Sequence, residues 1–134
     1  MNQNIKHSVF IVDDDQDDRE SIRDAFMENK HHQDYTFMVN GDQLIGHLNE
    51  ASDKKHPSLI LLDLNMPGKG GTEVLRQIKG NDCLKSIPII VITTSSSAKD
   101  RETSYKLGAN CFLTKPDSYK ELLAITDSIA RLWL

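Results

Sequence analysis

The chain has 134 residues, a length that favours a single domain spanning residues 1–134. Its 16 Lys and Arg residues against 20 Asp and Glu residues give a net charge of −4, which excludes binding to nucleic acid through bulk positive charge. Hydrophobic residues at 38% and charged residues at 27% are typical of an ordered domain rather than a disordered chain.

Features of membrane and secreted proteins are absent from the sequence. The longest apolar runs, at residues 9–12 and 59–62, are far too short to cross a membrane. The opening stretch MNQNIKHS lacks the long apolar region of a signal peptide. The two cysteines, Cys83 and Cys111, form no CxxC motif and are too few for a disulfide framework. We therefore expect a cytoplasmic protein.

The first half of the chain alternates short apolar runs with segments of helical spacing. Residues 9–12 form a continuous apolar run, and apolar side chains at helical spacing follow at residues 22–26. A weaker run at residues 35–39 precedes a second helical pattern at residues 44–48. Continuous apolar runs are typical of strands buried on both faces, as in a parallel sheet.

The second half of the chain repeats this alternation. Residues 98–107 have the weakest apolar pattern, and we interpret them as a helix because the alternation requires one. The apolar runs lie at residues 59–62, 89–92 and 111–113, and the helical patterns at residues 74–78, 98–107 and 122–132.

The complete pattern predicts five strands, each followed by a helix. Parallel strands need crossover connections, and such crossovers are right-handed. We therefore expect an α/β fold in which a doubly wound parallel sheet has helices on both faces. The functional site of such a fold lies at the carboxyl ends of the strands.

Acids, hydroxyl groups and one lysine follow four of the predicted strands: Asp13 and Asp14 the first, Asp63 the third, Thr93 the fourth and Lys115 the fifth. Clustered carboxylates repel one another unless a cation is present, and oxygen ligands favour a hard divalent ion such as Mg²⁺. A lysine and a hydroxyl beside that ion suit phosphate oxygens. Each residue alone could be a turn former or a helix cap. Their coincidence at one sheet edge favours a metal and phosphate site.

Four motifs resemble the response-regulator receiver domain of the CheY-like type. They read FIVDDD, LLDLNMPGKGG, PIIVITT and GANCFLTKP, and the similarity extends from Val9 to about Trp133. The last part of the chain is similar to the single-domain regulators associated with bacterial phytochromes. The resemblance implies a flavodoxin-like sheet with the strand order 2-1-3-4-5.

The resemblance also implies which residues accept the phosphoryl group and hold the metal. Asp63 would be the phosphoacceptor, forming an acyl phosphate. Asp13 and Asp14 would hold Mg²⁺ together with Asp63, and Asn65 would offer its backbone carbonyl to the metal.

A second set of implied roles concerns the response to phosphorylation. Lys115 would pair with a phosphoryl oxygen, or with Asp63 before phosphorylation, and the hydroxyl of Thr93 would follow the new phosphoryl group. Phe112 would occupy the aromatic switch position and turn into the space that Thr93 vacates. The Lys115–Pro116 peptide bond would be cis, a form that only an X–Pro bond adopts at low cost.

We expect a switch and not an enzyme: a stand-alone response regulator of a two-component or phosphorelay system, phosphorylated by a sensor histidine kinase such as a bacteriophytochrome. The alternative is a phosphorylation-independent interaction module with the same fold, but the complete set of site residues argues against it. A dehalogenase-type phosphatase is a third reading. It fails because Asp17 stands where that motif requires Thr or Val.

The expected output surface consists of the fourth predicted helix, the fifth strand and the fifth helix. Its partner would be a downstream protein or a second copy of the chain, with no nucleic acid and no membrane. The weak apolar face of residues 98–107 is typical of a loosely held element. Leu132, Trp133 and Leu134 add apolar side chains at the C-terminus, where fraying would normally expose them.

Overall fold

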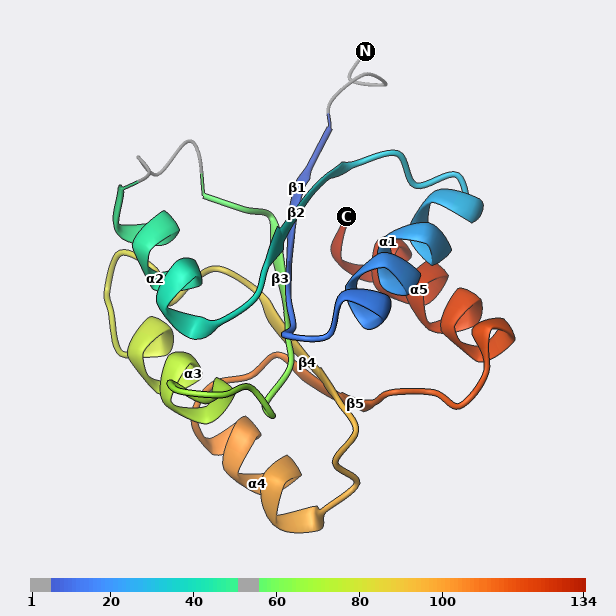
Figure 1. Ribbon diagram of the computed structural model, residues 1–134. Coiled ribbons are helices and arrows are strands. Elements are labelled where there is room, and N and C mark those ends of the chain that lie inside the picture. The colour runs from blue at the N-terminus through green and yellow to red at the C-terminus, as the bar shows by residue number, and fades with distance from the viewer. Residues whose placement is uncertain (1–5, 51–55) are drawn as a thin grey trace.

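The computed structural model describes residues 6–50 and 56–134 and contains a parallel sheet with helices on both faces (Figure 1). The described strands pair in the order β2-β1-β3-β4-β5, which confirms the predicted flavodoxin-like topology. Expectations about residues 1–5, including part of the opening stretch, lie outside the described residues. The strands are β1 (Ser8–Val12), β2 (Asp34–Met38), β3 (Leu59–Leu62), β4 (Ile89–Thr93) and β5 (Cys111–Thr114).

The helices divide between the two faces of the sheet. In Figure 1, α1 and α5 cover one face, while α2, α3 and α4 cover the other. The helices are α1 (Gln16–Glu28), α2 (Gly41–Glu50), α3 (Gly71–Lys79), α4 (Ala98–Lys106) and α5 (Tyr119–Trp133).

Strand β3 explains why continuous apolar runs predicted this fold. All of its residues are buried, and successive side chains point to opposite faces. Leu59 and Leu61 pack with α1 and α5, while Ile60 and Leu62 pack with α2 and α3. A strand of alternating apolar and polar residues would leave one of these helix layers without a core.

Helix α4 is attached differently from the other helices. The only residue that it buries is Ser104, as its weak apolar pattern predicted. Polar contacts fix it instead: the Ser97 side chain caps its first turn, and the Tyr105 hydroxyl accepts a hydrogen bond from the Phe112 backbone N–H at 3.0 Å. The helix therefore contributes little hydrophobic burial to the fold.

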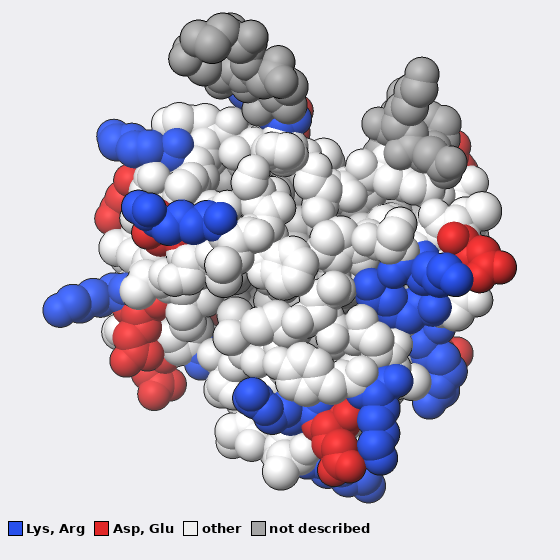
Figure 2. All heavy atoms as spheres, turned by 180° about the vertical axis from the view of Figure 1, so that it is seen from behind, with Lys and Arg blue, Asp and Glu red and all other residues white. Residues whose placement is uncertain are grey.

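Charged side chains of both signs mix on the face opposite to the view of Figure 1. Figure 2 shows Lys and Arg beside Asp and Glu around the rim of this face, with an uncharged centre. This face presents no continuous basic surface. Within the described residues, no helix is both long and apolar enough to cross a membrane.

Candidate functional site

The carboxyl ends of β1 and β3 bring three carboxylates together. The Asp13 N–H donates to the Met38 carbonyl and the Asp63 N–H to the Val12 carbonyl, both at 3.0 Å, so the sheet fixes both residues. Asp13 and Asp63 are 2% and 4% exposed as whole residues, whereas Asp14 faces solvent. One carboxylate oxygen from each of the three residues lies within 4.8 Å of the others. The predicted convergence at the sheet edge is therefore confirmed.

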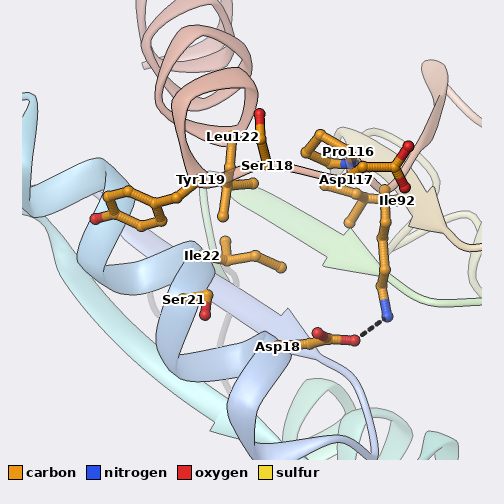
Figure 3. Close-up of a pocket in the computed structure, with 10 residues that line it drawn as sticks. Asp18, Ser21, Ile22, Ile92, Pro116, Asp117, Ser118, Tyr119 and Leu122 are labelled. Atoms are coloured by element: carbon orange, nitrogen blue, oxygen red, sulfur yellow. Dashed lines mark hydrogen bonds and ion pairs between the residues drawn. The ribbon is translucent and has the colours of Figure 1, made fainter.

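Lys115 enters this group from the end of β5. Its ammonium nitrogen lies 2.7 Å from an Asp13 oxygen, 2.7 Å from an Asp18 oxygen and 3.3 Å from an Asp63 oxygen. The contact with Asp63 was expected for the unphosphorylated protein. Asp18, in the first turn of α1, was not singled out by the sequence as a member of this site, and its ion pair is drawn as a dashed line in Figure 3.

Burial and charge act against each other on these groups. Burial raises the pKa of Asp13 to about 6, against the smaller lowering by Lys115 and by the Asp15 N–H. Burial alone would lower the pKa of Lys115, but its contacts with Asp13 and Asp18 carry that pKa above the ordinary value. Lys115 therefore stays cationic, and burial makes the ionisation of Asp13 cost free energy.

The donor set fits a hard divalent cation. It consists of oxygen atoms alone, from three carboxylates of which one has a raised pKa in the protein without metal. A divalent ion near them would compensate the burial of the Asp13 charge. Backbone donors already orient two of the carboxylates: the Asp15 N–H contacts Asp13 at 2.9 Å and the Asn65 N–H contacts Asp63 at 3.2 Å.

The loop after Asp63 approaches β3 too closely for a side chain at Gly71. A Cβ atom there would lie 2.5 Å from the Asp63 carbonyl oxygen and 2.6 Å from Leu64 Cα. The Gly71 N–H instead donates to the Leu64 carbonyl at 3.1 Å, which brings the start of α3 against the end of β3. Gly68 has a φ of +76°, a conformation that favours glycine. These two glycines shape the loop that carries Asn65.

Asn65 links the acidic group to the end of β4. Its side-chain amide donates to the hydroxyls of Thr93 and Thr94, each at 3.3 Å. Thr93 is completely buried. The structure therefore places the Thr93 hydroxyl beside the loop of Asp63, as expected, while the metal-binding role of the Asn65 carbonyl stays a prediction.

Phe112, the expected aromatic switch residue, is buried in the core on the sheet face that α2, α3 and α4 cover (Figure 1). Its role in the response to phosphorylation stays a prediction. Its backbone N–H contacts Tyr105, which the sequence did not mark as a functional residue. Nothing in the sequence around Tyr105 predicts that its hydroxyl contacts the backbone of β5.

The predicted cis bond between Lys115 and Pro116 is wrong for this structure, because no peptide bond among the described residues is cis. The trans form of an X–Pro bond is favoured by about 0.5–1 kcal/mol, so a cis bond requires packing that selects it. Here the Lys115 N–H donates to the Thr93 carbonyl at 2.6 Å. The Lys115 side chain reaches Asp13, Asp18 and Asp63 without a cis bond.

Comparison with known proteins agrees with the geometry. The model of the response regulator receiver domain family matches residues 9–127. The response regulator Rcp1 of Synechocystis sp. is 34% identical over 129 residues, which cover 94% of this chain and 88% of Rcp1. Other curated relatives are longer: this chain spans 51% of the sensory transduction protein RegX3 of Mycobacterium tuberculosis, at 32% identity.

Solved structures of response regulators are also similar to this chain. The phosphorylated cyanobacterial phytochrome response regulator RcpA has 32% identity and a TM-score of 0.88, with coverage of 96% of this chain and 94% of RcpA. The Mn²⁺-bound form of Rcp1 has 34% identity and a TM-score of 0.85, with the same coverage. RPA3017 of R. palustris, described as acting in red light signalling, has 25% identity and a TM-score of 0.87, again with 96% and 94% coverage.

The sequence match, the strand order and the acidic site support one conclusion. The site is that of a two-component signalling domain with a divalent metal site, rather than of a conventional enzyme. This chain belongs to the response regulator receiver domain family.

Proposed function

We propose that this chain acts in the cytoplasm as a single receiver domain that accepts a phosphoryl group on Asp63 from a sensor histidine kinase, in a Mg²⁺-dependent reaction. The position of the Asp63 carboxylate carries the proposal. It is 4% exposed, its Oδ2 lies 3.3 Å from the Lys115 ammonium, and its ligand oxygen lies within 4.8 Å of those of Asp13 and Asp14. A carboxylate between a metal site and a fixed cation is suited to phosphoryl transfer.

Asp63 suits the acceptor role better than its two neighbours. Both oxygens of Asp13 have close partners, the Asp15 N–H at 2.9 Å and the Lys115 ammonium at 2.7 Å. Asp14 faces solvent. The contacts of Asp63 are longer, 3.2 Å to the Asn65 N–H and 3.3 Å to the Lys115 ammonium, and its loop carries Asn65 to the Thr93 hydroxyl. A new group on Asp63 would therefore lie near the residue proposed to respond to it.

The transfer makes one bond and breaks another. A carboxylate oxygen of Asp63 bonds to phosphorus while the bond from phosphorus to the kinase histidine nitrogen breaks, and that nitrogen keeps the electron pair. Mg²⁺ supplies positive charge that offsets the repulsion between the anionic donor and the carboxylate. Asp13, Asp14 and the Asn65 carbonyl would hold the ion, and Lys115 would contact a phosphoryl oxygen.

The choice of Mg²⁺ rests on the all-oxygen donor set, because Mg²⁺ commonly binds one or two carboxylates and keeps several waters. The known roles of two similar proteins support the kinase partner. RcpA is a phytochrome response regulator, and RPA3017 acts in red light signalling. We therefore place a bacteriophytochrome upstream of this chain.

The output surface is proposed to comprise α4, β5 and α5, with a downstream protein or a second copy of the chain as its partner. Two observations support this proposal. Helix α4 buries no hydrophobic side chain, and the apolar Leu132 near the C-terminus is 78% exposed. An element held by few apolar contacts can move at low cost in free energy.

Incubation with acetyl phosphate and Mg²⁺ tests the acceptor assignment. Intact-mass analysis should show one added phosphoryl group on the parent protein and none on Asp63→Asn, which keeps the size of the side chain but removes the carboxylate. A matched Asp17→Asn variant, altered at an exposed position, should be labelled like the parent. Absence of labelling in the parent would favour the alternative function, a phosphorylation-independent interaction module.

A further inference from the structure

Three carboxylates surround the ammonium group of Lys115, which donates hydrogen bonds to two of them, Asp18 and Asp63. An ammonium offers three donors, and here the carboxylates of Asp13, Asp18 and Asp63 lie at 2.7, 2.7 and 3.3 Å. The two short contacts are with Asp13 and Asp18, not with the proposed acceptor. A phosphoryl oxygen on Asp63 would therefore compete with these carboxylates for Lys115.

The fold of α1 holds Asp18 in this position. Asp15 caps the helix by accepting a hydrogen bond from the Asp18 N–H at 3.0 Å, which fixes the first turn. Ile22, one turn further, is buried on the same side of the helix. Asp18 and Ile22 both line a pocket of about 170 Å³ between α1 and the segment before α5 (Figure 3). The neighbouring Asp17 is exposed.

Charge makes the Asp18 contact relevant to an anion. The four carboxylates of Asp13, Asp14, Asp18 and Asp63, with the one ammonium of Lys115, carry a formal net charge of −3. A divalent ion reduces this to −1, and only the removal of Asp18 would make the metal-loaded site neutral without loss of a proposed ligand or of the acceptor. The Asp18 side chain is 40% exposed, so solvent screens part of its effect.

We propose that Asp18 is a positioning residue that draws the Lys115 ammonium toward α1 and so weakens its hold on a phosphoryl group at Asp63. This inference rests on the proposed function of the site. Asp18 touches neither the metal nor the phosphoryl group in this account and acts through Lys115. Its removal releases one donor of Lys115 for the anion.

The test measures the affinity for beryllofluoride, a phosphoryl mimic, at Mg²⁺ saturation by calorimetry. Asp18→Asn should bind beryllofluoride about three- to fivefold more tightly than the parent, as expected for one partly exposed ion pair. Asp17→Asn removes the same charge from the same helical turn without a contact to Lys115 and should bind like the parent. Asp18→Glu keeps the charge and should also keep the parent affinity.

Two further measurements distinguish an effect of Asp18 through Lys115 from a general effect of charge or of protein stability. In a Lys115→Met background, Asp18→Asn should lose most of its effect, since the contact through which Asp18 acts is gone. Raising the salt concentration should narrow the gap between the parent and Asp18→Asn, because the pair is partly exposed. Thermal unfolding of each variant identifies any loss of folded protein.

The outcomes are distinct. If Asp18→Asn binds beryllofluoride equally or more weakly than the parent, the proposed role of Asp18 is wrong. A full effect in the Lys115→Met background would also overturn it, because Asp18 would then act directly on the anion. If the parent itself does not bind beryllofluoride with Mg²⁺, the proposed function fails first, whatever the variants do.

Discussion

Helices α1 and α4 both follow strands that end at the acidic site, yet the protein holds them by different forces. Helix α1 buries Ile22, Ala25 and Phe26 and is further joined to α5, where the Asn29 side chain donates to the Leu123 carbonyl at 2.7 Å. Helix α4 buries only Ser104 and depends on hydrogen bonds.

This difference separates the part that holds the site from the part that can respond to it. The segment Asp13–Asp18 leads into the firmly packed α1, so its carboxylates keep their geometry. Thr93 leads into α4, whose movement exposes little apolar surface. A switch needs an element of low local stability next to a rigid binding site, and the two helices meet these two needs.

Among the substitutions that compare α1 with α4, Phe26→Ala on α1 should reduce the stability of the protein most. Phe26 is fully buried, and Phe26→Ala should lower the free energy of unfolding by about 3–5 kcal/mol, through lost burial and a cavity. Tyr105→Ala on α4 removes a ring that is 41% exposed, together with its hydroxyl, and should cost about 2 kcal/mol. Urea unfolding measures both values. Equal losses would show that α4 is packed as firmly as α1.

Neutralisation of Asp13 should change how stability depends on pH. Burial raises the pKa of Asp13 to about 6. Without metal, the stabilisation of the folded state by the protonated Asp13 is therefore fully present below pH 3.8 and is lost as pH rises through about 6. Asp13→Asn should therefore unfold at a higher temperature than the parent at pH 8 without Mg²⁺. Its free energy of unfolding should be about 3 kcal/mol higher there, and this difference should disappear near pH 4.

Thermal unfolding in a chelator measures this difference, and Asp17→Asn is the matched control. Addition of Mg²⁺ should stabilise the parent more than Asp13→Asn, because the ion binds the folded carboxylates. A pH profile of the parent that is parallel to that of Asp13→Asn would contradict the raised pKa.

The bond between Tyr105 and Phe112 should have a smaller effect. Tyr105→Phe removes the hydroxyl that accepts the Phe112 N–H and should destabilise the protein by about 1 kcal/mol. Tyr119→Phe is the control, since its hydroxyl lies 3.5 Å from Glu28 at an exposed position. Amide exchange at Phe112 should accelerate in the first variant only. Unchanged amide exchange at Phe112 in Tyr105→Phe would show that the Tyr105 hydroxyl does not help to hold α4 against β5.

Substitution of Thr93 should leave the fold nearly intact but uncouple α4. Thr93→Ala should still accept a phosphoryl group, while losing most of the change in amide exchange that beryllofluoride causes over residues 98–112. The reason is that a phosphoryl oxygen would draw the Thr93 hydroxyl away from Asn65, now 3.3 Å away. The same protection change in parent and variant would show that another residue carries the coupling.

The sequence predicted the fold because each strand is a continuous apolar run, and burial on both faces leaves few alternatives to a parallel sheet. It predicted Asp13, Asp63, Thr93 and Lys115 as neighbours for the same reason, since parallel strands end at one edge. The weak attachment of α4 was also visible, in the lack of apolar residues along 98–107.

Three features could not be read from the sequence. The ion pair of Asp18 with Lys115 joins residues 97 positions apart and depends on how α1 packs against the sheet. The contact of Tyr105 with a backbone N–H has no pattern of residue types. The third feature is the trans form of the Lys115–Pro116 bond. An X–Pro pair alone does not determine its isomer, because the two forms differ by only about 0.5–1 kcal/mol.

The central claim is that Asp63, and no other carboxylate of the site, accepts the phosphoryl group. Borohydride reduces an acyl phosphate to the alcohol, so a phosphorylated aspartate becomes homoserine and is marked permanently in its peptide. After treatment with acetyl phosphate, Mg²⁺ and borohydride, peptide mass spectrometry should find homoserine at position 63 in the parent and at no position in Asp63→Asn. Homoserine at position 13, 14 or 18 in the parent, with Asp63 unmodified, would contradict the account.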